Sequence, residues 1–227
     1  MWADDKKKVV TFSYDDGFIH DVRLVEMFNR HGLKCTFNLN SGLMGKASRR
    51  LMYEGKPAER INSQNAIKIY KGHEIAAHFL THARFLEVSR EQLETEIVQD
   101  IKNLSELFGC DIVGMAYPFG QYSDALIDIL RENGIKYART VEASHSFEIK
   151  NDLMRLHPTC KHNDKKLFEL AEYFVNATPA EPMLFYVWGH SFDFDCESDW
   201  DMMEEFCKYI SGRGDIFYGT NREVLNL

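Results

Sequence analysis

Short apolar runs rich in β-branched and aromatic residues alternate with helical patterns along the whole chain. The predicted strands cover residues 9–13, 34–39, 74–77, 112–116, 135–138, 153–156, 183–188 and 216–218. Such alternation is typical of βα units, whose strands lie parallel in one sheet. About eight strands in 227 residues predict an α/β fold, a distorted (β/α) barrel with about seven or eight mostly parallel strands. An open doubly wound sheet is the alternative.

Helical patterns fill the segments between these runs. They cover residues 21–31, 63–71, 123–133, 164–176 and 198–211. The clearest helix begins at Ser89, because Gln92 follows at the capping-box spacing and apolar residues recur on one face. Residues 41–62 break the alternation, and we expect an irregular loop with a helical piece there. Without repeats or low-complexity linkers, residues 1–227 are expected to form one domain.

Composition excludes several classes of protein. The formal net charge is −8 and no long basic cluster occurs, so a nucleic-acid partner is not expected. No stretch approaches the roughly 18 apolar residues of a membrane span. The five cysteines are scattered without a CxxC pair, which argues against a cysteine zinc site and a disulfide framework. Residues 1–5 carry no apolar signal core. A cytoplasmic location is expected, or a secreted one if a leader has been removed; oligomeric state stays open.

Five polar residues stand directly after predicted strands: Asp15, Asp16, His78, His82 and His190. In a parallel barrel the chemistry lies at the carboxyl ends of the strands, where these side chains would meet. A carboxylate with two imidazoles makes a divalent-metal site that leaves positions open for water and substrate. The sequence therefore predicts a metal hydrolase.

The metal ligands are expected to be Asp16, His78 and His82. The two histidines have the i, i+4 spacing, which would place them on one side of a helical turn. Each motif also has a simpler interpretation. Asp15-Asp16-Gly17 alone could be a polar turn, and the histidine pair could be a helix start with surface side chains. The combination of the two motifs favours the metal site.

Three further residues are candidates for catalysis. Asp15, beside a ligand, could act as a base, and His190, after a buried strand and near carboxylates, could act as an acid. Arg155 lies at the end of an apolar run and could pair with Asp15, although a surface salt bridge is an equal alternative. The aromatic loop Tyr117-Pro118-Phe119 and the strand residue Trp188 are candidates for substrate and oxyanion contacts. A simple aromatic turn is the competing interpretation of that loop.

From Val9 to His190 these motifs resemble the polysaccharide deacetylases, the carbohydrate esterase group that includes chitooligosaccharide and peptidoglycan deacetylases. Asp15-Asp16-Gly17 is similar to the first family motif, His78 and His82 to the His-x-x-x-His motif, and Pro118-Phe119-Gly120 to the Pro-aromatic-Gly loop. The resemblance implies a distorted β/α barrel, Asp15 as base and Asp16, His78 and His82 as metal ligands. It also implies an oxyanion contact from the Phe119 N–H and His190 as acid.

Three positions depart from the family pattern. Phe79 stands where members usually carry Ser or Thr after the first metal histidine, and Ala116 stands at the usual Arg of the third motif. We expect Arg155 to replace that arginine. The usual Asp-Trp of the fourth motif has no match at its expected place, because Asp199-Trp200 comes after His190.

The resemblance implies removal of acetyl groups from N- or O-acetylated carbohydrate, with Zn²⁺ as the expected metal and Co²⁺ or Ni²⁺ as alternatives. Two other functions remain open at this point. The same site could hydrolyse another small amide or ester. The altered third motif at Ala116 could instead mark a carbohydrate-binding protein that has lost catalysis.

Overall fold

The computed structural model describes residues 6–227, so the expectation about residues 1–5 lies outside the described part. The main sheet contains β1 (Lys8–Asp15), β2 (Cys35–Leu39), β5 (Glu74–Ala77), β6 (Gly114–Ala116), β7 (Tyr137–Arg139), β8 (Cys160–Lys161), β9 (Met183–His190) and β10 (Ile216–Tyr218). The helices are α1 (Asp21–Arg30), α2 (Ser63–Ile69), α3 (Arg90–Phe108), α4 (Asp124–Glu132), α5 (Leu167–Asn176), α6 (Asp193–Glu197), α7 (Trp200–Ile210) and α8 (Asn221–Val224). Single 3₁₀ turns lie at η2 (Ser41–Leu43), η3 (Phe85–Glu87), η4 (Pro118–Gly120) and η5 (Leu153–Arg155).

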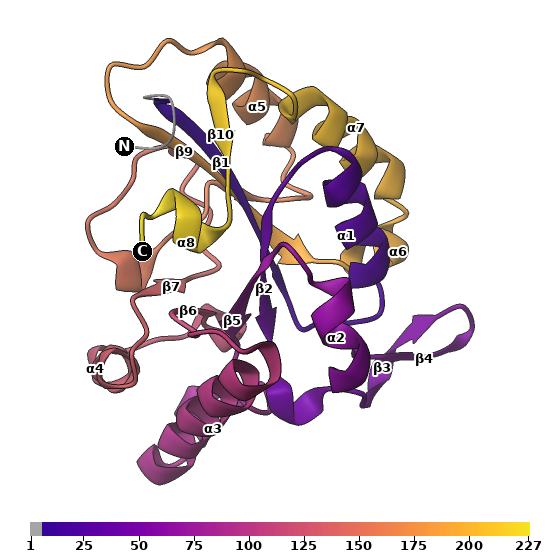
Figure 1. The fold of residues 1–227 in the computed structure, drawn as a ribbon, viewed down its shortest axis with the longest axis vertical. Coiled ribbons are helices and arrows are strands. Elements are labelled where there is room, and N and C mark those ends of the chain that lie inside the picture. Colours follow the sequence, from indigo (N-terminus) through magenta and orange to yellow (C-terminus); the bar gives the residue numbers. More distant parts are fainter. Residues whose placement is uncertain (1–5) are drawn as a thin grey trace.

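The strands follow the order β7-β6-β5-β2-β1-β9-β8, and β10 pairs with the first half of β1. Every pairing within this sheet is parallel. All residues of the central strands β1 and β2 are buried, because helices surround the sheet (Figure 1) and side chains fill its interior. Burial on both faces explains why these strands read as nearly continuous apolar runs. The predicted barrel class is confirmed.

A short segment brings the two ends of the sheet together. Leu156 donates to Ala138 and accepts from Thr140 beside β7, at 3.0 and 2.9 Å. A few residues later Thr159 donates to Tyr186 of β9 at 2.8 Å, and β8 continues this pairing. Since one segment bonds both to β7 and to β9, from the two sides of the sheet, the sheet curls into a distorted barrel. The strand predicted over residues 153–156 is wrong: η5 occupies it, and Leu156 alone forms a bridge to β7.

Residues 41–62 are more regular than predicted. They form η2 and then an antiparallel hairpin of β3 (Ala47–Tyr53) and β4 (Lys56–Glu59), which projects away from the main sheet (Figure 1). The hairpin base returns to the barrel, because Arg60 forms an isolated antiparallel bridge with Phe18. This insertion therefore stands beside the end of β1, which carries Asp15 and is followed by Asp16.

Helix α8 contacts the inside of the sheet near the strand starts. Its Asn221 accepts from Thr11 at 2.9 Å and donates to Tyr186 at 2.7 Å, and its backbone N–H donates to Thr36 at 2.9 Å. These polar contacts lie away from the carboxyl ends of the same strands. The carboxyl ends of these strands are therefore not covered by these contacts of α8 and can form the candidate site.

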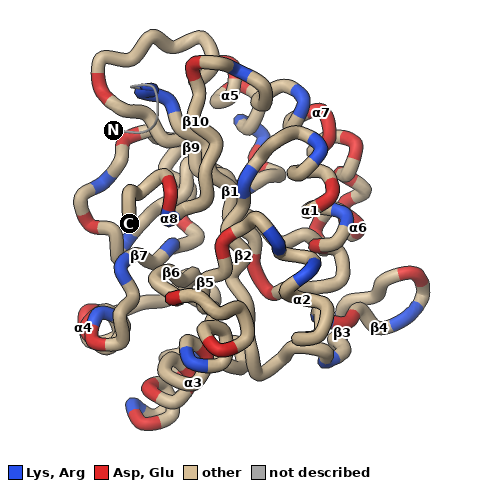
Figure 2. Tube along the Cα trace, in the orientation of Figure 1, with Lys and Arg blue, Asp and Glu red and all other residues tan. Residues whose placement is uncertain are grey.

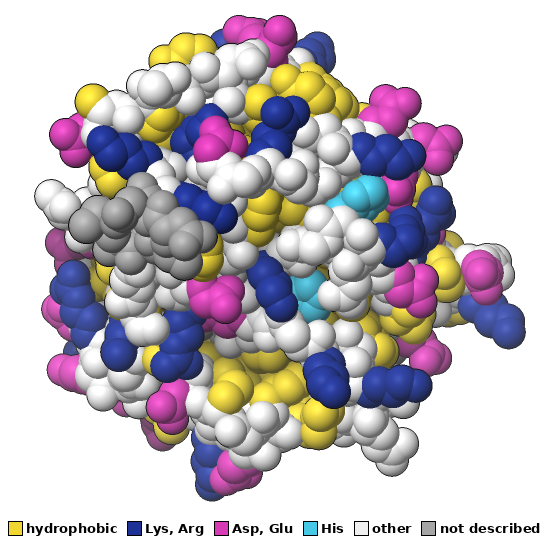
Figure 3. Space-filling view, turned by 45° about the horizontal axis from the view of Figure 1, so that its top comes forward, with side chains coloured by type: hydrophobic (Ala, Val, Ile, Leu, Met, Phe, Trp, Pro, Cys, Tyr) yellow, Lys and Arg dark blue, Asp and Glu magenta, His cyan; other side chains and the backbone are white. Residues whose placement is uncertain are grey.

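The surface carries charges of both signs. Acidic and basic residues are spread over all parts of the chain trace (Figure 2), and they are interspersed on the face shown in Figure 3. Within residues 6–227, no helix is both long and apolar enough to span a membrane.

Candidate active site

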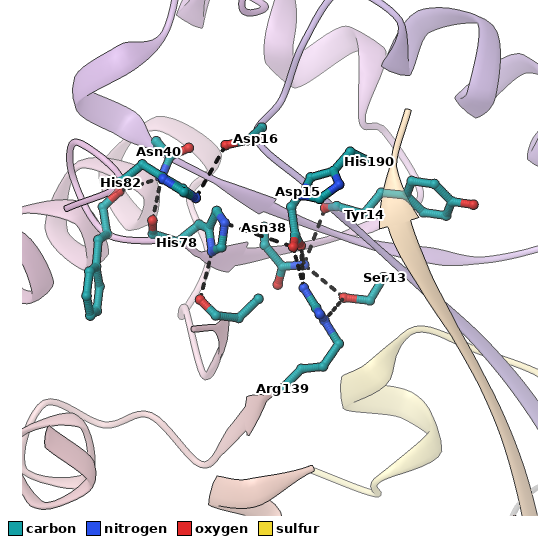
Figure 4. A network of polar contacts seen from close by, with 12 residues as sticks. Ser13, Tyr14, Asp15, Asp16, Asn38, Asn40, His78, His82, Arg139 and His190 are labelled. Atoms are coloured by element: carbon teal, nitrogen blue, oxygen red, sulfur yellow. Dashed lines mark hydrogen bonds and ion pairs between the residues drawn. The ribbon is translucent and has the colours of Figure 1, made fainter. Parts of the chain in front are cut away.

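The polar residues singled out in the sequence lie at one edge of the sheet. Asp15 is the last residue of β1 and is paired in register with His190, the last residue of β9. His78 follows β5 directly. Because these strands are parallel, their carboxyl ends meet, and Figure 4 shows the side chains converging there. This edge is the candidate active site.

Three side chains at this edge can share one ion. Asp16, His78 and His82 each offer a ligand atom, and these atoms all lie within 4.8 Å of one another. The His82 Nε2 and Asp16 Oδ1 atoms are 3.8 Å apart. Ligand bonds of about 2.1 Å bring the ligands of one ion to within about 4 Å of each other. The three residues therefore fit a divalent cation after shifts of less than about one ångström.

The imidazoles are prepared as neutral ligands. The Nδ1 atom of His78 lies 2.7 Å from the Ala116 carbonyl oxygen, which can only accept, so this nitrogen carries the proton. The lone pair on Nε2 is then free for an ion. Burial is the main cause that lowers the pKa of both His78 and His82 to about 4. Both rings are therefore neutral near pH 7 and can bind a cation without first losing a proton.

The segment that carries both histidines is a loop, and the predicted helical turn is wrong. Residues 78–82 have no helical assignment, and Phe79 and His82 have positive φ angles of 61° and 57°. Non-glycine residues adopt this left-handed conformation at a cost of roughly 1–2 kcal/mol each. Phe79 is 1% exposed, so its ring anchors the loop in the core. The two rings converge with centroids 4.7 Å apart by this path.

Asp15 is a buried carboxylate held in a fixed position. The Arg139 Nη2 atom donates to both of its oxygens, at 2.6 and 2.5 Å, and the Asn38 amide donates to Oδ1 at 2.8 Å. Burial would raise the pKa of Asp15, but Arg139, with smaller contributions from His78 and His190, outweighs burial and lowers it. The carboxylate is therefore ionised near neutral pH. Its Oδ2 lies 3.9 Å from the Nε2 of His78, beside the candidate metal site.

His190 has a carboxylate partner that sequence reasoning did not single out. Its Nδ1 lies 3.3 Å from Asp193 Oδ2, and Lys161 donates to the same oxygen at 2.8 Å. Burial lowers the pKa of His190, but the Asp193 hydrogen bond and the charges of Asp15 and Asp16 outweigh it and raise the pKa. The sequence feature that could have identified Asp193 as this partner is its i, i+3 spacing from His190.

The loop after β6 divides into buried and exposed parts. Tyr117 is 1% exposed, its hydroxyl donates to the Met154 carbonyl at 2.8 Å, and Pro118 is buried too. Phe119 is 43% exposed, has a positive φ of 59°, and packs edge-on against His82 with centroids 4.6 Å apart. The prediction that Tyr117 contacts a substrate is therefore wrong for its side chain, which supports the loop. Phe119 is the member of this loop that stands open beside the site.

A model of the family described as polysaccharide deacetylase matches residues 3–138, more than half of the chain. The chain belongs to the polysaccharide deacetylase family. A comparison with curated proteins found no match. The barrel geometry described above agrees with this membership.

Solved structures share the fold at low sequence identity. A candidate polysaccharide deacetylase from Mycobacterium smegmatis is 17% identical with a TM-score of 0.69, and the match covers 100% of this chain and 91% of that one. Puue allantoinase is 11% identical with a TM-score of 0.68, covering 99% and 91%. Streptococcus pyogenes deacetylase PplD, solved in complex with acetate, is 20% identical with a TM-score of 0.58, covering 67% and 64%. This chain therefore spans less than two thirds of the length of PplD.

In this polysaccharide deacetylase family member, the third motif lacks its usual arginine, and an arginine from another strand pairs with Asp15 in its place. The predicted Arg155–Asp15 pair is wrong, because Arg155 donates to Asp152 and Asp124 at the surface. Arg139, at the end of β7, is fully buried and makes the pair instead. In the sequence, Arg139 directly follows the apolar run 135–138. This is the same pattern that pointed to Arg155, but it was not considered for Arg139.

Trp188 supports this arginine from one side. Its ring centroid lies 4.5 Å from the Arg139 guanidinium carbon, and the ring is only 7% exposed. Its indole Nε1 is buried without a hydrogen-bond partner among the described residues. The structure therefore gives Trp188 a packing contact with Arg139, and its predicted contact with substrate stays a prediction.

Proposed function

We propose that this protein is a divalent-metal-dependent deacetylase that removes acetyl groups from N- or O-acetylated carbohydrate. One observation carries the proposal: Asp16, His78 and His82 present their ligand atoms within 4.8 Å of one another at the strand ends. Family membership supports deacetylation as the reaction. Zn²⁺ is the expected ion, with Co²⁺ and Ni²⁺ as alternatives, since a carboxylate and two imidazoles suit all three.

The chemistry divides between the ion and two side chains. When bound, a divalent cation would polarise the acetyl carbonyl and make a water molecule more acidic. Asp15 is the base, because its lowered pKa keeps it ionised and ready to accept the proton of the attacking water. Its bonds to Arg139 and Asn38 hold the carboxylate beside His78.

His190 is the acid in this proposal. Its raised pKa keeps a larger fraction of the ring protonated near neutral pH, and Asp193 holds the ring through Nδ1. The Nε2–H is then left to donate a proton to the leaving amine or alcohol. The backbone N–H of Phe119 as an oxyanion donor is a further part of the proposal, since its left-handed backbone beside His82 suits such a role.

A second candidate is hydrolysis of another small amide or ester by the same groups. It is favoured by the likeness to an allantoinase, an enzyme named for a different substrate. A protein that binds carbohydrate without catalysis is the third. The paired base, acid and candidate ligand set argue against this third function, because binding alone requires none of them.

A cytoplasmic location and a single-domain organisation also remain proposals.

Acetate release separates these functions. The purified protein would be tested on acetylated chitooligosaccharides, acetylated xylan and simple amides, with and without a chelator. We expect acetate from at least one carbohydrate, loss of release with chelator, and recovery on adding Zn²⁺. Activity on amides alone supports the second function, and sugar binding with no acetate release supports the third. His190→Ala should keep the metal and lose turnover; normal deacetylation by this variant would remove the acid assignment.

A further inference from the structure

The loop that carries His78 and His82 is held by one face of helix α3. This helix packs beside β5, and its residues Glu96 and Asp100 are four positions apart, which places them on the same side. Asp100 contacts the start of the loop and Glu96 contacts its end. Neither residue is among the groups to which the mechanism above gives a role.

Asp100 gathers three donors although it lies in the interior of the protein. Its Oδ1 accepts from the Ser41 N–H at 2.8 Å and from the Ser41 hydroxyl at 2.6 Å, and its Oδ2 accepts from the His78 N–H at 3.1 Å. The residue is 0% exposed. The His78 N–H also donates to the Leu39 carbonyl of β2 at 3.0 Å, so Asp100 and β2 together fix where the β5 strand ends and the loop begins.

Glu96 fixes the other end of the loop. Its carboxylate accepts from the Thr81 N–H at 2.7 Å and from the Thr81 hydroxyl at 2.5 Å. Its backbone carbonyl also accepts from the Leu80 N–H at 3.0 Å. These contacts stand directly before His82, whose positive φ of 57° requires a defined chain path.

Asn40 completes the support from the opposite side. Its amide donates to the carbonyl oxygens of His78 and of Phe79, the latter at 2.8 Å. Phe79 occupies the position where the family usually carries Ser or Thr, so it has no hydroxyl to hold the loop. In this chain Asn40, directly after β2, and the two carboxyl groups of α3 hold the loop instead.

We propose that Asp100 and Glu96 are positioning residues that set the affinity of the site for its metal ion. The inference rests on the proposed function, because it assumes that Asp16, His78 and His82 bind a divalent cation. The carboxylates act through the backbone: they hold residues 78–82 in a path with two left-handed residues, so that both imidazoles point at Asp16. Without them the loop is free to relax and the ligand atoms separate.

The test measures Zn²⁺ affinity by competition with a chromophoric chelator in wild type, Asp100→Asn and Glu96→Met. Asp100→Asn keeps the size of the side chain but turns an NH₂ group toward one of the N–H donors that Asp100 binds. Glu96→Met keeps the length of the side chain but removes both oxygens that accept from Thr81. Glu106→Met is the matched control, since Glu106 is on the same helix and its ion pair is with Lys102. The unfolding temperature of each metal-free protein is measured in parallel. Acetate release is followed over a range of Zn²⁺ concentrations.

Asp100→Asn and Glu96→Met are expected to weaken Zn²⁺ binding by about 10–100-fold, the usual effect of removing a group that supports metal ligands. Saturating Zn²⁺ should restore most of their activity, and Glu106→Met should bind within about twofold of wild type. If both variants bind Zn²⁺ like wild type, the positioning role is wrong while the proposed function stands. If wild type itself binds no divalent ion, the proposed function fails first. Should Asp100→Asn not fold, Glu96→Met alone decides the question, because the contacts of Glu96 with Thr81 are at the surface.

Discussion

Replacing Arg139 with Met tests how the candidate base is held. Met preserves much of the side-chain volume but removes the guanidinium, whose Nη2 atom donates to both Asp15 oxygens. Arg139 is 0% and Asp15 3% exposed, so the lost partner is a buried one. The substitution leaves a buried carboxylate with the Asn38 amide as its remaining side-chain donor among the described residues.

The expected cost follows from this burial. Removing one partner of a buried ion pair typically destabilises a protein by about 3–5 kcal/mol. The pKa of Asp15 should also move from below to above its ordinary value, because burial raises this pKa and Arg139 is the main group that lowers it. Complete loss of the base would cost roughly 10²–10⁴-fold in activity, so a base that is partly protonated at neutral pH should lose up to that amount.

The stability deficit should depend on pH. In wild type the pKa of Asp15 is lowered on folding, so the pair stabilises the protein above the unfolded pKa and this contribution is lost as pH falls through the folded pKa. The deficit of Arg139→Met should thus be largest near neutrality. It should shrink as pH falls through the raised pKa of Asp15 in the variant, and further below about pH 4, where wild type loses the contribution of the pair.

Urea unfolding at several pH values measures this deficit, and initial acetate release measures activity. Arg155→Met is the matched control, since Arg155 pairs at the surface with Asp152 and Asp124 and should show little change in either assay. The double variant Asp15→Asn/Arg139→Met should recover stability relative to Arg139→Met alone, because no unpaired charge remains. Equal effects of the Arg139 and Arg155 substitutions would refute the assignment of Arg139 to Asp15.

Three other predictions follow from the site. Asp193→Asn should move the alkaline limb of kcat/KM to lower pH by about one unit or more, because it removes the carboxylate that raises the pKa of His190; an unmoved limb would show that His190 is not the titrating acid. Phe119→Ala should weaken substrate binding more than turnover, since the ring is 43% exposed beside His82 while its backbone N–H is retained. A kcat loss with unchanged KM would argue against that division. Incubation with a chelator should abolish acetate release and lower the unfolding temperature, and calorimetry that finds the same temperature with and without chelator would contradict a bound ion.

Much of the fold could be predicted because its signals are local. The capping box between Ser89 and Gln92 marks the start of α3, and both of its hydrogen bonds are present. The buried strands β1, β2 and β9 appear in the sequence as apolar runs because they are covered on both sides. Asp15 and His190 end β1 and β9, and His78 directly follows β5, so parallel pairing was enough to bring the three residues to one edge.

The remaining features depend on contacts between distant segments. Choosing between Arg139 and Arg155 required knowing which strand end faces β1, and this is set by the curl of the sheet. The β3–β4 hairpin lacks a clean apolar alternation, so its period gave no signal. The path of residues 78–82 depends on Asp100 and Glu96 from α3, and no spacing within the loop itself indicates two left-handed residues.

The metal content of the purified protein tests the central claim most directly. Elemental analysis should find close to one divalent ion per chain in wild type. It should find almost none in His82→Ala, whose remaining ligands Asp16 and His78 cannot hold an ion alone. Full acetate release by a protein shown to contain no metal would contradict the account.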